Sequence, residues 1–232
     1  MTSNIVDDAI VFVKNELKRH PHTNSHTDWL HIERVLKLAE HIAKTEYPQC
    51  DLELVRLGCC LYELNPFKYD YEIEMRPGLE YMKPVYHHNS NTAAEKLNEF
   101  LGQYNHTMPN KKILLDMICN LSWRKLNNNN AQTALPDSDE FKILHDATRL
   151  ESIGAVGLVR FFNKAGRHVS FPLSSANMDK GKDLVTYFVD KASCVEKNMK
   201  TKTGAELATR RAETRKIFIA SLMEEVNFLN NV

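Results

Sequence analysis

The sequence predicts a single domain built only of α-helices. Apolar residues recur at three- and four-residue spacing in most segments that lie between turn signals, which is the pattern of amphipathic helices. With 232 residues, of which 43% are hydrophobic, the chain can build a sizeable core. It contains no internal repeat, and no linker separates a second domain. We therefore expect residues 1–232 to fold as one all-α unit.

The first two helices follow from the apolar pattern at the start of the chain. This pattern predicts a helix over residues 5–20. Asp28 is a candidate N-cap of the second helix, whose broad apolar face continues until Pro48 ends it. His31 therefore lies in the first turn of the second helix.

A third helix is expected in the middle of the fold. Asp51 is a plausible N-cap for residues 52–64, a segment that is apolar on nearly every side, as a central helix is. Tyr62 and Glu63 lie in its last turn. The segment 65–91 holds several prolines among aromatic and charged residues, which predicts a long irregular stretch beside the end of this helix.

Helical spacing resumes after this stretch and continues to the end of the chain. A capping box, Thr203–Glu206, is expected to open the last helix. Residues 166–175 are the one stretch that could form a short hairpin. The other expected helices cover residues 92–104, 111–123, 141–150, 152–163 and 182–197.

Four basic residues surround the expected cap of the last helix: Lys200, Lys202, Arg210 and Arg211. The N-terminus of a helix can bind an anion, because its backbone N–H groups point outward. Charged side chains that flank a cap are more often simply solvated. We therefore assign no site to these residues.

The charge balance and the cysteine pattern exclude several classes of protein. Lys plus Arg and Asp plus Glu number 30 each, and no basic run is flanked by aromatic residues, so we expect no nucleic-acid binding. We find neither a signal peptide nor an apolar run near the ~20 residues of a membrane span. Five cysteines without a CxxC pair indicate reduced thiols. We expect a cytoplasmic protein that does not bind membranes, although a nuclear location stays open.

Four stretches of the sequence carry a family pattern. They read TDWLHIERV at residues 27–35, LYEL at 61–64, DATRLESIGAVG at 146–157 and MKTKTGAELA at 199–208. In order and spacing they resemble HD-superfamily phosphohydrolases, and they are most similar to the small bacterial and fungal branch that includes nucleotide pyrophosphatases. The resemblance implies an HD-domain helical bundle, with the core motifs in residues 28–163 and C-terminal helices in residues 182–230.

In that family two histidines and two aspartates bind a divalent metal, which activates water to attack a phosphate. By position, His31 matches the first histidine and Asp146 the last aspartate. Tyr62 and Glu63 stand in place of the His-Asp pair that gives the family its name. A phenol, whose ordinary pKa is about 10, is a poor replacement for imidazole, and glutamate is one methylene longer than aspartate. The resemblance thus implies a metal site that is only partly kept.

Other positions of the family's active site have also changed. Pro66 replaces an acidic residue that orients or deprotonates water in the family. Leu121 stands where the family's HSF motif has its histidine, and Thr148 replaces the second aspartate of the DAD motif. Neither proline nor leucine has an acid–base group. We therefore assign no catalytic residue at these positions.

Basic residues persist at three matching positions, Arg34, Lys68 and Arg149, where they could hold an anion. We therefore expect a catalytically impaired pseudoenzyme, without a cofactor, that keeps the fold to bind a nucleotide-like anion or a protein partner. A structural alternative stays open. The basic residues could simply pair with acids such as Glu63 and Asp146 in a vacated pocket, because buried carboxylates need a counter-charge.

The second hypothesis is an active nucleotide phosphohydrolase. His31, Glu63 and Asp146 would then hold Mn²⁺ or Mg²⁺, because such hard cations accept carboxylate oxygens. His87 or His88 from the long irregular stretch could add a ligand. This hypothesis requires a stoichiometric metal, whereas the first predicts none. The sequence carries no signal for the oligomeric state.

Overall fold

In a computed structural model of the protein, the described residues are 4–19, 29–64, 90–104, 108, 110–121, 136–168 and 184–228. Every regular element in these ranges is helical. The predicted all-α fold class is therefore confirmed. None of the described helices combines the length and the apolar character needed to cross a bilayer.

The helices follow one another in the predicted order, and most of their bounds lie within a few residues of those that the apolar spacing predicts. Two predicted segments, 52–64 and 111–123, end earlier as α-helices than expected. The elements are α1 (Ile5–Arg19), α2 (Trp29–Glu46), α3 (Leu52–Leu61), the 3-10 turn η1 (Tyr62–Leu64), α5 (Ser90–Gly102), α6 (Lys111–Cys119), α8 (Asp139–Leu150), α9 (Gly154–His168), α10 (Leu184–Lys197) and α11 (Lys202–Phe228).

Side-chain caps mark the start of two central helices. Asp51 Oδ1 accepts a hydrogen bond of 3.0 Å from the backbone N–H of Leu54, which confirms its predicted role as the N-cap of α3. Ser138 Oγ accepts a hydrogen bond of 3.1 Å from the N–H of Phe141 at the start of α8. Both caps satisfy backbone donors that the helix itself leaves without partners.

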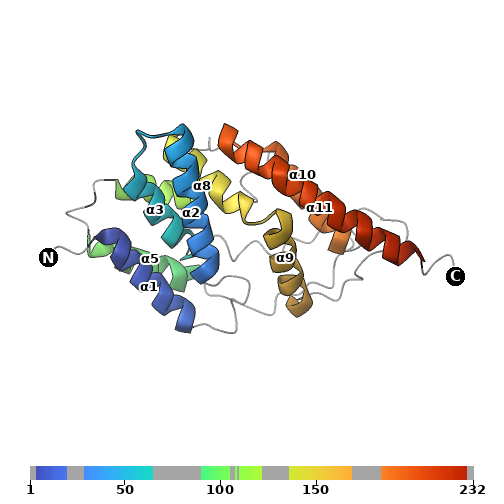
Figure 1. The fold of residues 1–232 in the computed structure, drawn as a ribbon. Helices are drawn as coiled ribbons and strands as arrows, with labels where there is room; N and C mark the ends of the chain where they lie inside the picture. Colours follow the sequence, from blue (N-terminus) through green and yellow to red (C-terminus); the bar gives the residue numbers. More distant parts are fainter. Residues whose placement is uncertain are drawn as a thin grey trace.

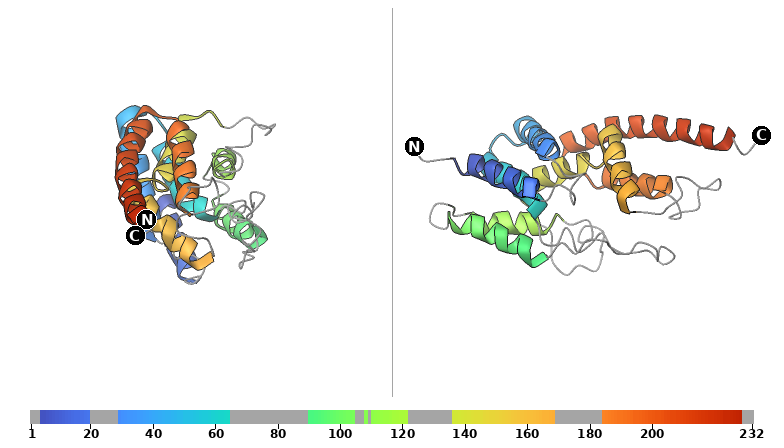
Figure 2. Two further views of the ribbon diagram at one scale, coloured as in Figure 1. Left: turned by 90° about the vertical axis from the view of Figure 1, so that its right-hand side faces the viewer. Right: turned by 90° about the horizontal axis from the view of Figure 1, so that it is seen from below.

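The central helix is α3, as its apolar sequence predicts. It packs against α1, α2, α6 and α8, and Figures 1 and 2 show these helices grouped on the N-terminal side of the molecule. Gly58 permits the close approach of α8, because a Cβ at this position would lie 2.7 Å from Leu144 Cδ2. The largest fully buried side chains include Ile32, Ile42, Leu57, Leu61, Leu114, Met117, Phe141, Ile143 and Leu144.

The longest described helix, α11, extends from the centre of the fold to the C-terminal end. Its 27 residues correspond to a length of about 40 Å. It begins beside the end of α2 and runs past α9 and α10 (Figure 1). The buried side chain of Arg215 on α11 binds Glu196 on α10, with an Nε–Oε1 distance of 3.2 Å and an Nη2–Oε2 distance of 3.1 Å.

The start of α11 differs from the prediction. Thr201 is its N-cap, and the Oγ1 atom accepts a hydrogen bond of 2.8 Å from the N–H of Gly204. The predicted capping box at Thr203–Glu206 is therefore wrong by two residues. The backbone N–H of Thr203 lies inside the first turn and donates to Glu46 Oε2 at 2.9 Å. Thr201 and Thr203 are both candidate N-caps, and contacts with distant residues select Thr201.

The predicted hairpin is wrong at its start, because residues 166–168 continue α9. The last turn of this helix contains no large apolar residue, so apolar spacing could not mark its end. Residues 169–175 of the same prediction lie outside the described residues, as does the predicted irregular stretch from residue 65 to residue 89.

Candidate functional site

His31 lies in the first turn of α2 and faces two buried carboxylates. Its Nε2 atom is 3.2 Å from Glu63 Oε1, and its Nδ1 atom is 3.2 Å from Glu151 Oε2. Glu63 comes from η1, and Glu151 follows the last residue of α8. All three residues are at most 2% exposed. We call these residues, together with Tyr62 and Arg34, the His31 cluster.

Tyr62, which the sequence resemblance aligns with a family histidine, completes one side of this cluster. Its hydroxyl lies 2.5 Å from His31 Nε2. Burial raises the pKa of the Tyr62 phenol well above its ordinary value, and the neighbouring charge of Glu63 raises it further. Tyr62 therefore stays a neutral phenol, which is a poor ligand for a divalent cation.

Glu151 is the residue of the cluster that sequence reasoning missed. Its Oε2 atom accepts a hydrogen bond of 2.9 Å from Arg34 Nε as well as facing His31. Burial by itself raises the pKa of this carboxyl, but the hydrogen bonds from His31 and Arg34 outweigh burial, so the pKa lies below the ordinary value. Glu151 is therefore a buried, ionised carboxylate. The sequence did hold a signal for Glu151, because it is an acidic residue within the family stretch at residues 146–157.

Three arginines from three different helices converge on the end of α8. Arg34 of α2 binds the Glu151 carboxylate, and Arg160 Nη1 of α9 donates to the Glu151 carbonyl at 2.9 Å. Arg211 Nη1 of α11 donates to the carbonyl of Leu150. Cations stabilise the C-terminal end of a helix, where carbonyl groups lack partners within the helix. The end of α8 therefore carries an excess of positive side chains.

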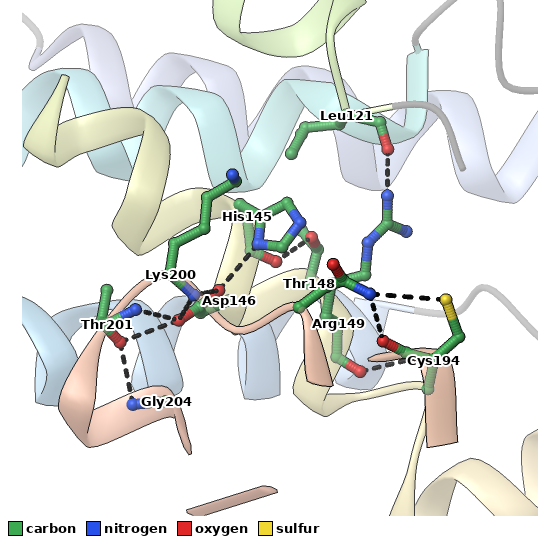
Figure 3. Close-up of polar contacts among 11 residues, drawn as sticks. Leu121, His145, Asp146, Thr148, Arg149, Cys194, Lys200, Thr201 and Gly204 are labelled. Atoms are coloured by element: carbon green, nitrogen blue, oxygen red, sulfur yellow. Dashed lines mark hydrogen bonds and ion pairs between the residues drawn. The ribbon is translucent and has the colours of Figure 1, made fainter. Parts of the chain in front are cut away.

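Asp146 has a different environment from His31, and Figure 3 shows its contacts. The carboxylate is fully buried. Its Oδ2 atom accepts hydrogen bonds of 2.8 Å from both the backbone N–H and the hydroxyl of Thr201, and the N–H of Lys200 lies 3.0 Å from each carboxylate oxygen. Asp146 thus binds the backbone that leads into α11.

A second acid completes the cap of α11. Glu46, the last residue of α2, accepts hydrogen bonds from the N–H groups of Lys202 at 3.1 Å and Thr203 at 2.9 Å. Burial raises the pKa of Glu46, but these backbone hydrogen bonds lower it below its ordinary value. Four successive N–H groups, at residues 200–203, are therefore satisfied by Asp146 and Glu46. We call this arrangement the Asp146 anchor, and it occupies the helix terminus, which is the usual place for an anion to bind.

His145 supports the Asp146 anchor from α8. Its Nδ1 atom lies 2.7 Å from Asp146 Oδ1, and the ring is buried. Burial lowers the pKa of His145 despite the opposing hydrogen bond to Asp146, and the charges of Arg149 and Lys200 lower it further. A neutral imidazole therefore donates from Nδ1 to the carboxylate.

Arg149, one of the predicted anion ligands, makes a contact within the protein. Its Nη2 atom donates to the backbone carbonyl of Leu121 at 2.5 Å (Figure 3). Burial lowers the pKa of Arg149 to about 10. The side chain of Leu121 is in the core, and Thr148 Oγ1 donates to the carbonyl of His145 at 2.8 Å. These residues therefore bind structural partners in the described part of the chain.

Several predicted site residues lie outside the described residues: Pro66, Lys68, His87 and His88. Nothing in the structure bears on their predicted roles.

The described donors do not fit the family's metal site of two histidines and two aspartates. His31 and Glu63 lie together, but the described hydrogen bonds of Asp146 go to His145, Lys200 and Thr201. Among the described residues, no three His, Cys, Asp or Glu side chains are grouped so that they could hold a metal ion. Glu63, one nitrogen of His31 and the neutral phenol of Tyr62 together form a weak donor set for Mn²⁺ or Mg²⁺.

Comparison with known proteins gives matches in structure. No model of a known protein family matches the chain, and no curated protein matches its sequence. An HD-superfamily hydrolase from Bacillus thuringiensis superposes with a TM-score of 0.65 at 21% identity, covering 96% of each chain. A protein from Lactobacillus plantarum gives a TM-score of 0.71 at 20% identity, over 95% of this chain and 98% of the other. YpgQ of Bacillus subtilis in complex with ADP gives 0.64 at 24% identity, over 95% and 97% of the two chains.

Proposed function

We propose that this chain, which has the helical fold of the HD superfamily, binds a nucleotide-like anion without the divalent metal of HD phosphohydrolases. The fold that the sequence motifs predict is confirmed by the structural neighbours. The main support for the proposal is the pair of buried carboxylates, from Glu63 and Glu151, that face the two ring nitrogens of His31.

Protein side chains can supply the counter-charge that a metal supplies in the family. Two buried carboxylates are costly unless cations or hydrogen-bond donors compensate them. The two ring nitrogens of His31 face Glu63 and Glu151, and the Arg34 guanidinium supplies a cation at Glu151. A metal ion would have to displace these contacts to reach the carboxylates. This supports a site in which ion pairs take the place of a metal.

The excess of arginines supports binding of an anion. Three guanidinium groups, from Arg34, Arg160 and Arg211, contact Glu151 or the carbonyl of the preceding residue. The Arg34 side chain is 38% exposed, so a ligand in solvent can reach it. The structural neighbour YpgQ binds ADP, and guanidinium groups match the geometry of phosphate oxygens. A phosphate-bearing nucleotide is therefore the class of ligand that we propose.

Calorimetric titration with ADP, in EDTA and separately with Mn²⁺, tests this proposal. We expect binding of similar affinity under both conditions and no release of phosphate. Arg34→Gln should weaken binding about tenfold, because it removes a charge-assisted contact. Lys37→Gln is the matched control, since this lysine is on the same helix and its side chain is 71% exposed. Binding that requires Mn²⁺, or turnover of ADP, would contradict the proposal.

A further inference from the structure

We propose that Arg34 and Arg211 together form the phosphate clamp of this site, so that the final helix contributes directly to ligand binding. The inference rests on the proposed function and identifies the groups that recognise the ligand's phosphate. Arg34 is in one of the family motifs, whereas nothing in the sequence pattern assigns a binding role to Arg211.

The two guanidinium groups bind neighbouring residues, Arg34 through the side chain of Glu151 and Arg211 through the backbone of Leu150. Arg34 Nε donates to Glu151 Oε2 at 2.9 Å, and Arg211 Nη1 donates to the carbonyl of Leu150, the preceding residue. Each guanidinium has five N–H donors, and the hydrogen bond described for each arginine uses one of them. These contacts fix the position of both forks, while further donors can bind an oxyanion.

The local charge favours an anion between the two arginines. Glu151 is the carboxylate that lies near both. Burial lowers the pKa of Arg211, the negative charge of Glu151 opposes this, and the positive charge of Arg34 adds to the lowering, so the two cations are close enough to repel each other. A phosphate dianion would relieve this repulsion, because it can accept hydrogen bonds from both planar forks.

Gly154 seats the Arg211 side chain against the turn between α8 and α9. Its φ of +70° is rarely adopted by other residues, and a Cβ at this position would lie 2.9 Å from Arg211 Cβ and 3.0 Å from Arg211 Cγ. The aliphatic stem of Arg211 therefore packs on backbone at a place where a side chain is excluded. This packing orders the guanidinium before a ligand binds, which lowers the entropic cost of binding.

Two other places for an anion are already used in the described part of the chain. The N-terminus of α11 is occupied by the carboxylates of Asp146 and Glu46. Arg149 donates to the Leu121 carbonyl. The Arg34–Arg211 pair is therefore the position at which the described charges best accommodate a phosphate group.

Titration of pyrophosphate and ADP in EDTA into the full chain and its variants tests the clamp. We expect Arg211→Gln to weaken binding about tenfold or more, and Arg211→Lys to weaken it less, because lysine keeps the charge but loses the fork. Arg210→Gln, at the exposed neighbouring position on α11, is the matched control and should stay within about twofold. Circular dichroism checks that each variant is folded.

A measurement on the unmodified protein keeps the test decisive if Arg211→Gln does not fold. In spectra of the arginine Nε–H groups, pyrophosphate should shift the signals of both Arg34 and Arg211. These signals are assigned by their loss in Arg34→Lys and Arg211→Lys. The clamp is refuted, and the proposed function stands, if the unmodified protein binds pyrophosphate or ADP and Arg211→Gln binds it equally well. The same conclusion follows if the unmodified protein binds but the Arg211 signal does not shift. If neither ligand binds at all, the proposed function fails and the clamp with it.

Discussion

Asp146→Asn probes the Asp146 anchor, because it removes the charge and keeps the shape. The fully buried carboxylate accepts hydrogen bonds from His145, Lys200 and Thr201. Asparagine has one acceptor oxygen and places an NH₂ group at the second position, where it meets another donor. Either the His145 ring or the backbone of Lys200 and Thr201 then loses its acceptor.

The expected loss of stability is about 3–5 kcal/mol, the cost of breaking a buried charged contact by removing one partner. One or two charge-assisted hydrogen bonds, at about 1.5–3 kcal/mol each, give a similar figure. Glu46→Gln is the matched control, because this partly exposed acid caps the same helix through two N–H groups. Its loss should cost about 1 kcal/mol.

Urea unfolding followed by circular dichroism, with and without EDTA, measures both variants. The anchor predicts the full loss for Asp146→Asn under either condition. A metal ligand would behave differently, because removing one of several carboxylates from an empty site relieves repulsion. A change below about 0.5 kcal/mol in EDTA would refute the anchor, since substitutions without structural consequence fall in this range.

Three further substitutions test other parts of the site. Glu151→Gln should cost about 2–3 kcal/mol of unfolding free energy near pH 7. Because the folded-state pKa of Glu151 lies below 4.5, this cost should persist above pH 4.5 and shrink as the pH falls through the folded-state pKa. Urea unfolding at several pH values measures the cost, and a cost that does not change with pH would show that the carboxylate is not ionised. Gly154→Ala should destabilise the protein by about 1–2 kcal/mol, because alanine is strained at a positive φ. It should also weaken ADP binding, because the new methyl group would displace the side chain of Arg211. An unchanged affinity in calorimetric titration would contradict the packing of Arg211 on Gly154 as a determinant of binding. The double change Tyr62→His with Glu63→Asp should strengthen Mn²⁺ binding at least about tenfold over the unmodified chain, and equal affinities in a calorimetric titration would show that Tyr62 does not limit metal binding.

The helical fold could be predicted because its determinants are local. Apolar spacing gave the helices, and the Asp51 cap lies three residues from the N–H group that it accepts. The cap of α11 could not be chosen in this way, because the local pattern favours Thr203, which has Glu206 three residues later, whereas Thr201 has Gly204 at that spacing. Carboxylates from α8 and α2, which lie 55 and 156 residues away respectively, select Thr201.

The candidate site was predictable only where a motif marked it. His31 and Glu63 lie together, as their positions in the family pattern imply. The partner that binds His31 from the other side, Glu151, is 120 residues away, and no periodicity connects the two. The second hypothesis makes Asp146 a metal ligand together with His31, but the contacts of the Asp146 carboxylate depend on the path of residues 200–203. That path is set by tertiary packing of α11 against α2 and α8.

The metal content of the protein, measured together with its activity, tests the central claim most directly. The protein is purified without chelator, bound metal is determined by elemental analysis, and the same preparation is assayed on nucleoside mono-, di- and triphosphates with Mn²⁺, Mg²⁺ and Co²⁺. We predict metal well below one equivalent and no hydrolysis, with ADP binding retained. Near-stoichiometric metal and a turnover that His31→Ala abolishes would contradict the account and establish a metal-dependent phosphohydrolase.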